Sequence, residues 1–212
     1  MQILEEISEA LQRGKLKDVT ELVTKALDDG VSAKDILENG LLHGMGILGG
    51  KFKRNEVYIP EVLIAARAMN AGSALLKSAL TSEGVQAAGT VVLGTVKGDL
   101  HDIGKNLVRM MMEGKGLKVV DIGIDVPAEK FIEAAKSENA QIIACSALLT
   151  TTMNELKNVI EAANAAGIRD KLKIMIGGAP ITEDFRKSIN ADLYAPDAAS
   201  AADAAARACG AA

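Results

Sequence analysis

The sequence predicts a chain in two parts: an all-α four-helix bundle, followed by an α/β domain with a five-stranded parallel sheet. Two observations support this prediction. Apolar residues recur at helical spacing through residues 1–82, whereas residues 90–212 alternate short apolar runs with helical segments. Continuous apolar strands that alternate with helices are typical of a parallel sheet covered on both faces. The stretch 83–89, which contains two glycines, separates the two patterns and is predicted to be a linker.

Four helices are predicted in the first part. The first two carry their apolar residues over Ile3–Leu11 and Leu16–Leu27. A third begins after Ser32, whose side-chain oxygen can cap free amide groups, and runs toward Gly49-Gly50. Pro60 suits the first turn of a fourth helix, which leads to the linker. Four antiparallel helices of this length form a small bundle.

Five strands are predicted in the second part, near residues 90–95, 118–122, 141–145, 172–176 and 192–194. Helices are predicted to follow them, near residues 104–115, 128–138, 153–166, 182–189 and 198–208. Five such units suit a flavodoxin-like, Rossmann-type sheet with strand order 2-1-3-4-5, whose crevice opens at the carboxyl ends of strands 1 and 3. The loops after these two strands carry Asp99, His101 and residues 146–152. We therefore predict that these residues face each other.

The composition limits the classes of partner. The chain has 212 residues, a formal net charge of −4 and no tryptophan. Nucleic acid is not an expected partner of an acidic chain, because contacts to phosphate dominate that affinity. No apolar stretch has the length of a membrane span, and the acidic N-terminal segment is unlike a signal peptide. Two distant cysteines make no disulfide framework. A cytoplasmic protein without nucleic-acid or membrane partners is the expectation.

One loop carries the main chemical signal of the sequence. The segment Gly98–Gly104 (GDLHDIG) lies between the first predicted strand and the helix that follows it. It presents His101 two residues after Asp99, at the edge where an open α/β sheet binds its ligands. A metal-ligating imidazole needs its other ring nitrogen held by a carboxylate or a carbonyl group. The pair therefore suits metal chemistry.

The number of potential ligands restricts the metal. The chain has only two histidines and two cysteines, in separate segments, whereas a zinc site takes three or four protein ligands. A single histidine does not hold a bare ion well, so a metal at His101 is expected to arrive in a macrocycle. The sequence lacks C-x-x-C-H, which argues against covalently attached c-type haem. Non-covalent haem and a corrin both stay open on this argument.

The motif D-x-H-x-x-G at residues 99–104 resembles the signature of cobalamin-binding domains. The whole stretch 94–106 is very similar to that of cobalamin-dependent methionine synthase. Ser146-Ala147-Leu148 resembles the S-x-L of this family, and Gly177-Gly178 resembles its later G-G. The first eighty or so residues resemble the helical cap domain that precedes the cobalamin-binding module. In length and layout the chain is similar to the free-standing corrinoid proteins of methyltransferase systems, which demethylate methylamines, methanol, methoxylated aromatics or betaines.

The resemblance implies a cofactor and a set of residues. The cofactor is cobalamin or a related corrinoid (methylcobalamin, cob(I)alamin or hydroxocobalamin), bound base-off/His-on with His101 as the lower axial ligand. Asp99 accepts a hydrogen bond from the distal imidazole nitrogen, and Thr152 matches the serine that completes the relay of methionine synthase. A proton on this unit weakens the imidazole as a donor, which couples ligation to protonation. The implied cofactor-binding residues are Gly94, Gly98, Leu100, Asp102, Ile103, Gly104, Ser146, Leu148, Thr150, Gly177, Gly178, Tyr194 and Ala195.

The resemblance also implies a function and a division of the chain. Residues 1–82 are the cap, 83–89 the linker and 90–212 the cobalamin-binding domain. The chain is expected to accept a methyl group from a substrate-specific methyltransferase and to deliver it to a second one, with tetrahydrofolate or a thiol as acceptor. A reductive activation protein is the third expected partner. Two alternatives are the small subunit of an adenosylcobalamin mutase, which normally lacks the cap, and a cobalamin-dependent sensor, which typically carries a tryptophan and a DNA-binding domain.

Overall fold

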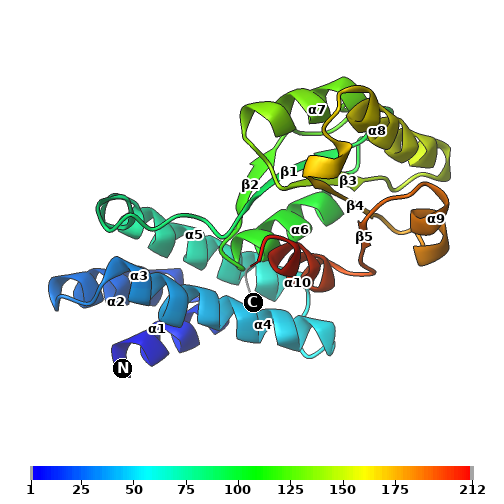
Figure 1. Cartoon of the computed structure of the whole chain (residues 1–212). Coiled ribbons are helices and arrows are strands. Elements are labelled where there is room, and N and C mark those ends of the chain that lie inside the picture. The colour runs from blue at the N-terminus through cyan, green and yellow to red at the C-terminus, as the bar shows by residue number, and fades with distance from the viewer. Residues whose placement is uncertain (1, 211–212) are drawn as a thin grey trace. The chain divides into compact units, whose positions relative to one another are not determined.

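The structure is a computed structural model that describes residues 2–210 (Figure 1). The contacts within the chain divide it into two compact units, with the division between residues 87 and 88. The first unit is entirely helical, and the second contains one five-stranded sheet. This confirms the predicted fold class, a helical bundle followed by a flavodoxin-like α/β domain.

The first unit contains the four predicted helical rods. Its elements are α1 (Gln2–Gln12), α2 (Leu16–Asp28), α3 (Ala33–Asp35), the π-helix η1 (Ile36–Leu42), α4 (His43–Lys53) and α5 (Ile59–Ser82). The elements α3, η1 and α4 follow one another without a break and form the third rod. The Ser32 hydroxyl accepts a hydrogen bond from the Asp35 amide at 3.0 Å, as its capping role predicts. The π-helical stretch is not predicted by the sequence pattern.

The rods are held together by an aliphatic core. Its fully buried side chains come from every rod and include Ile7, Leu11, Val19, Val23, Ile36, Leu41, Val62 and Leu76. They recur at the spacing of one helical face, so each rod turns its apolar stripe inward. Burying each such side chain contributes about 1.5–3 kcal/mol.

Glu83 closes this unit where α5 ends. Its carboxylate accepts hydrogen bonds from the amides of Ala33 at 2.8 Å and Lys34 at 2.9 Å, the first residues of the third rod. These amides have no partner within the helix, and a negative charge favours that end of the helix dipole. The first residue of the predicted linker therefore ties the end of α5 to the start of the third rod.

Glu83→Ala is expected to lower the free energy of unfolding of the first unit by about 1 kcal/mol, the usual cost of a lost N-terminal cap. Urea unfolding followed by circular dichroism measures this change. Glu21→Ala is the matched control, because it removes only an exposed ion pair with Lys17 at 3.7 Å. The control is expected to cost less than about 0.5 kcal/mol. Equal effects of the two substitutions would contradict the capping role of Glu83.

The second unit contains the predicted strands and helices. The strands are β1 (Thr90–Thr95), β2 (Lys118–Asp121), β3 (Ile142–Ser146), β4 (Lys173–Gly177) and β5 (Leu193–Tyr194). The helices are α6 (Ile103–Glu113), α7 (Ala128–Ser137), α8 (Met153–Ala165), α9 (Glu183–Ser188) and α10 (Ala198–Ala208). Two short 3-10 helices, η2 (Thr150–Thr152) and η3 (Arg169–Lys171), are additions to the predicted elements.

All strands of the sheet are parallel, in the order β2-β1-β3-β4-β5. Figure 1 shows α7 and α8 on one face of the sheet and α6 and α10 on the other. Phe131 of α7 and Leu156 of α8 are fully buried in the core that they form with Ile143 and Ile174 of the sheet. The register pairs Thr95 with Ser146, so β1 and β3 end side by side and their loops begin at the same edge. Of the described helices, none has the length and apolar character needed to cross a membrane.

Candidate functional site

Asp99 lies at the centre of the site, in the loop that follows β1. Its side chain has no exposed surface. Oδ1 accepts hydrogen bonds from two groups of His101, Nδ1 at 2.7 Å and the backbone amide at 3.1 Å. The imidazole is therefore held to the carboxylate two residues earlier in the chain, as the spacing of the two residues predicts.

The loop after β3 supplies the partners of the other carboxylate oxygen. Asp99 Oδ2 accepts hydrogen bonds from the amides of Leu148 at 2.7 Å and Leu149 at 3.2 Å. The Thr152 hydroxyl lies 3.0 Å from the same oxygen and 3.0 Å from the Leu149 carbonyl oxygen, so its single proton is shared between two acceptors. Two segments about fifty residues apart thus meet at one carboxylate, across the crevice between β1 and β3.

These contacts set the protonation of the pair. Burial by itself raises the pKa of Asp99, but hydrogen bonds from the His101 side chain and from the amides of Leu148, His101 and Leu149 hold that pKa well below its usual range. An ionised carboxylate only accepts hydrogen bonds, so a neutral imidazole carries its proton on Nδ1 and its lone pair on Nε2. Nε2 has no hydrogen-bond partner within residues 2–210, and the side chain of His101 is 51% exposed. Nε2 is therefore available to a metal.

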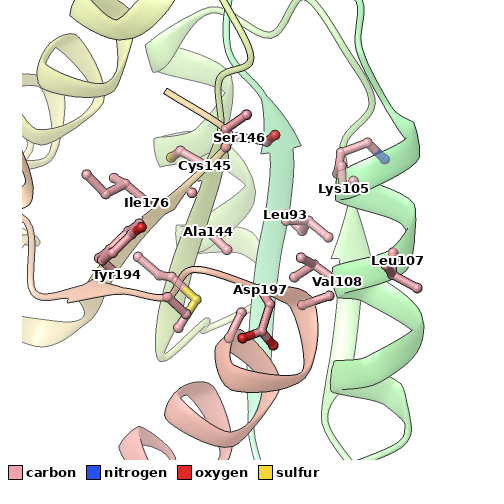
Figure 2. A pocket seen from close by; sticks show the side chains of 18 of the residues that line it. Leu93, Lys105, Leu107, Val108, Ala144, Cys145, Ser146, Ile176, Tyr194 and Asp197 are labelled. Carbon is pink, nitrogen blue, oxygen red and sulfur yellow. The ribbon is translucent and has the colours of Figure 1, made fainter. Parts of the chain in front are cut away.

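A cavity of about 370 Å³ opens beside His101 within the second unit. Figure 2 shows side chains of β1, β3, β4 and α6 around it, with Tyr194 on the opposite side from Leu93 and Val108. The lining is mostly aliphatic. Burial raises the pKa of the Cys145 thiol in this wall, so the thiol stays neutral. The cavity suits a ligand with a largely apolar part that enters from the carboxyl edge of the sheet.

Seven of the predicted cofactor-binding residues line this cavity together with His101: Gly104, Ser146, Leu148, Gly177, Gly178, Tyr194 and Ala195. The other six lie outside its lining: Gly94, Gly98, Leu100, Asp102, Ile103 and Thr150. A Cβ at Gly94 would meet Ile122 and Phe131 at 2.8 Å, so this glycine permits close packing of α7 on the sheet. Leu100 and Ile103 are 67% and 74% exposed. These two side chains form an apolar rim beside His101.

The last residue of β4, Gly177, and the next residue, Gly178, differ in their surroundings. Gly178 has φ +135°, and a Cβ there would lie 1.9 Å from the Ala147 carbonyl oxygen. Gly177 has no atom within 4 Å of such a Cβ. Gly178 therefore lets the loops after β3 and β4 touch, whereas Gly177 leaves open space in the cavity wall.

Two residues that the sequence analysis did not select also belong to the site. Lys105 lines the cavity, is only 4% exposed and forms an ion pair with Asp121 at the end of β2. Thr95 is fully buried, and its hydroxyl donates to the His101 carbonyl oxygen at 2.9 Å. Two sequence features could have identified them. Thr95 is a polar residue at the end of an apolar strand, and Lys105 is a lysine in the first turn of the helix that follows the His101 loop.

Asp99→Asn is expected to lower the free energy of unfolding of the second unit by about 2 kcal/mol at pH 7. Both oxygens of Asp99 accept hydrogen bonds, and the NH2 group of asparagine would place a donor where one of these acceptors is needed. The pKa of Asp99 in the fold lies below its unfolded value of about 4, so its ionisation stabilises the fold above that pH. This stabilisation is lost as the pH falls below about 4. Urea unfolding of the cofactor-free protein at several pH values tests both points.

The expected result is a difference between wild type and Asp99→Asn that shrinks as the solution becomes more acidic. Asp170→Asn, at an exposed aspartate of the same unit, is the control and is expected to show little difference at any pH. A difference of constant size down to pH 3 would show that Asp99 is not ionised in the fold.

The chain matches known families over most of its length. A family described as a B12 binding domain matches residues 89–206, and a second family of the same description matches residues 3–77. The chain is 44% identical over 202 residues to the dimethylamine corrinoid protein of Methanosarcina barkeri, covering 94% of each chain. It is 43% identical over 180 residues to trimethylamine corrinoid protein 1 of Methanosarcina acetivorans, covering 84% of this chain and 83% of that one.

Solved structures give the same result. The methanol:cobalamin methyltransferase complex MtaBC from Methanosarcina barkeri matches with a TM-score of 0.88 and 31% identity, over 99% of this chain and 80% of that chain. A cobalamin-binding protein from Desulfitobacterium hafniense DCB-2 matches with a TM-score of 0.81 and 30% identity, over 97% and 98% of the two chains. With its two B12-binding matches and these full-length relatives, the chain belongs to the B12-binding corrinoid proteins of methyltransferase systems.

Proposed function

We propose that this chain carries a methyl group on cobalt from a methylamine-specific methyltransferase to a second methyltransferase, whose acceptor is tetrahydrofolate or a thiol. A reductive activation protein is its third partner. The observation that carries the proposal is the His101 imidazole, which is anchored through Nδ1 and free at Nε2 beside the cavity. The relatives named for dimethylamine and trimethylamine support the choice of methyl donor.

The residues present fit a corrinoid. His101 Nε2 would ligate the cobalt, and the exposed rim of Leu100 and Ile103, together with the half-exposed Leu148, would contact the apolar parts of the corrinoid. The cavity would receive the nucleotide tail, since Gly104 and Gly177 leave open space where other residues place a Cβ. When bound, the corrinoid supplies the cobalt centre that accepts and releases the methyl group.

Asp99 and Thr152 are proposed to tune the ligand. Asp99 holds the Nδ1 proton of His101, which keeps the lone pair on Nε2 and raises the basicity of the imidazole. Thr152 donates to Asp99 or to the Leu149 carbonyl oxygen, so its hydroxyl can adjust to the charge of the carboxylate. A second proton on the His101–Asp99 pair would weaken Nε2 as a donor. Through these two residues, the protonation of the pair is coupled to metal ligation.

The two parts of the chain are proposed to have different roles. Residues 90–212 bind the corrinoid, residues 1–82 are the helical cap domain, and residues 83–89 link the two. The partner methyltransferases would carry out the demethylation of the donor and the methylation of the acceptor.

The test is a methyl-transfer assay with isotopic label. The full chain is loaded with hydroxocobalamin, reduced to the cob(I)alamin form and mixed in separate reactions with a dimethylamine, a trimethylamine or a methanol methyltransferase. Deuterium-labelled dimethylamine, trimethylamine and methanol are offered separately, and the protein-bound corrinoid is analysed by mass spectrometry. We expect label on the corrinoid from one of the amines. Label from methanol alone would overturn the methylamine assignment, and no label from any donor would overturn the carrier role with these enzymes.

A further inference from the structure

The loop that carries His101 is held from two sides. The loop after β3 binds the Asp99 side chain, as described above. The loop after β2 binds the backbone of the same segment through Asp125. The Asp125 amide donates to the Asp99 carbonyl oxygen at 3.0 Å, and Asp125 Oδ1 accepts from the Gly98 amide at 2.7 Å. The two hydrogen bonds therefore fix the peptide group before Gly98 and the peptide group after Asp99.

The backbone of Asp125 is in a conformation that few residues adopt. Its φ is +53°, in the left-handed region, and the other non-glycine residues of the described chain with positive φ are all asparagines: Asn55, Asn139 and Asn190. Asparagine and aspartate tolerate this region better than other residues, at a cost of about 1 kcal/mol. This conformation lets one residue use its amide and its side chain on the same neighbouring segment.

The loop after β2 is itself hydrogen-bonded to the end of β1, which fixes the position of the Asp125 backbone. Thr95 donates through its amide to the Gly123 carbonyl oxygen at 3.0 Å, and Val126 donates to the Thr95 carbonyl oxygen at 3.0 Å. The Thr95 hydroxyl then holds the His101 carbonyl oxygen at 2.9 Å. Asp125, Thr95 and His101 therefore belong to one hydrogen-bonded unit at the end of β1.

We infer that Asp125 is a positioning residue for the metal ligand: by fixing the Gly98-Asp99 backbone it sets the direction in which His101 presents Nε2. The inference rests on the proposed ligand role of His101. The Asp99 carboxylate is already anchored to the loop after β3, so a rotation of its backbone changes the angle between carboxylate and imidazole. Without the Asp125 carboxylate, the Gly98 amide has lost the acceptor that prevents this rotation.

Two substitutions separate the parts played by backbone and side chain. Asp125→Gly keeps the left-handed backbone and removes the acceptor. Asp125→Asn keeps an acceptor oxygen and tolerates the same φ. Each full-length protein is reconstituted with hydroxocobalamin, and the ratio of water-ligated to histidine-ligated corrinoid is measured from the visible spectrum.

We expect Asp125→Gly to raise this ratio about threefold to tenfold, as the loss of one net hydrogen bond allows. Asp125→Asn is expected to raise the ratio less than Asp125→Gly does, because its neutral amide oxygen still accepts the Gly98 hydrogen bond, although more weakly than the carboxylate. Thermal unfolding of the cofactor-free variants checks that both are folded. Asn139→Gly, at an exposed left-handed position that precedes β3 and so lies away from the carboxyl edge, is the matched control and should leave the ratio unchanged.

The outcomes distinguish this inference from the proposed function. If His101→Ala has the spectrum of the wild type, the ligand role of His101 fails, and the positioning role fails with it. If His101→Ala loses histidine ligation but Asp125→Gly keeps the wild-type ratio, only the positioning role is overturned. A ratio for Asp125→Asn as high as that of Asp125→Gly would also overturn it, because the acceptor oxygen would then be irrelevant.

Discussion

Replacing His101 with alanine is expected to convert the corrinoid-loaded protein from a histidine-ligated to a water-ligated species. Nε2 of His101 lies beside the cavity without a hydrogen-bond partner among the described residues, and Asp99 fixes the lone pair on it. Substitution of a residue that merely supports a metal ligand costs roughly 10–100-fold in metal affinity, so loss of the ligand itself should cost on the order of 100-fold or more in corrinoid retention. The visible spectrum after reconstitution with hydroxocobalamin and the amount retained on gel filtration measure both effects.

The chain provides a matched control for this experiment. Its other histidine, His43, is exposed at the start of α4 in the helical unit. His43→Ala is expected to leave the spectrum and the retention of corrinoid unchanged. Identical spectra for wild type and His101→Ala would remove His101 from the cobalt and, with it, the proposed roles of Asp99 and Thr152.

Gly178→Ala is expected to have the largest effect on stability. Its Cβ would lie 1.9 Å from the carbonyl oxygen of Ala147, whose amide donates to the Gly177 carbonyl oxygen at 3.0 Å and so holds this backbone beside β4. The backbone must therefore shift, at a cost of about 1–3 kcal/mol for overpacking. The φ of +135° adds a further cost of about 1–3 kcal/mol for a residue with a side chain. We expect a loss of about 2–6 kcal/mol in the free energy of unfolding of the second unit.

The neighbouring glycine is the control for Gly178. Gly177→Ala places its Cβ in open space, so the free energy of unfolding should change by less than about 0.5 kcal/mol. Because Gly177 lines the cavity, the same substitution should weaken corrinoid binding while it leaves the cofactor-free protein stable. Urea unfolding of both variants, followed by reconstitution of Gly177→Ala, tests this contrast. Equal stability of the two variants would contradict the close contact with Ala147.

The sequence pattern does not determine which of the three threonines after β3 contacts Asp99. Thr150, Thr151 and Thr152 are adjacent hydroxyl residues, and resemblance alone favoured Thr152 as the partner of Asp99. The short 3-10 helix η2 turns Thr152 inward, where its hydroxyl lies 3.0 Å from Asp99 Oδ2. A pattern of identical side chains cannot specify which of them faces a neighbour, because the turn between them sets the direction.

Asp125 and Lys105 were missed for a related reason. Each contacts a partner on a different segment: Asp125 the backbone at Gly98 and Asp99, and Lys105 the carboxylate of Asp121. Neither pair has a characteristic spacing along the chain. The contacts exist because β2 and β1 are neighbours in parallel register, which brings their loops to the same edge.

The local pattern of the chain was sufficient to predict the two-part fold, the strand order and the loop that presents His101. Helical and strand periodicities are local properties, the parallel topology restricts the order, and Asp99 and His101 are only two residues apart. The π-helix η1 was not predictable, because its i→i+5 hydrogen bonds join backbone groups that every residue carries. The convergence of donors on Asp99, the support from Asp125 and the contact that requires Gly178 were decided by tertiary structure alone. Each depends on backbone groups, which every residue carries and which become specific only when distant segments are placed together.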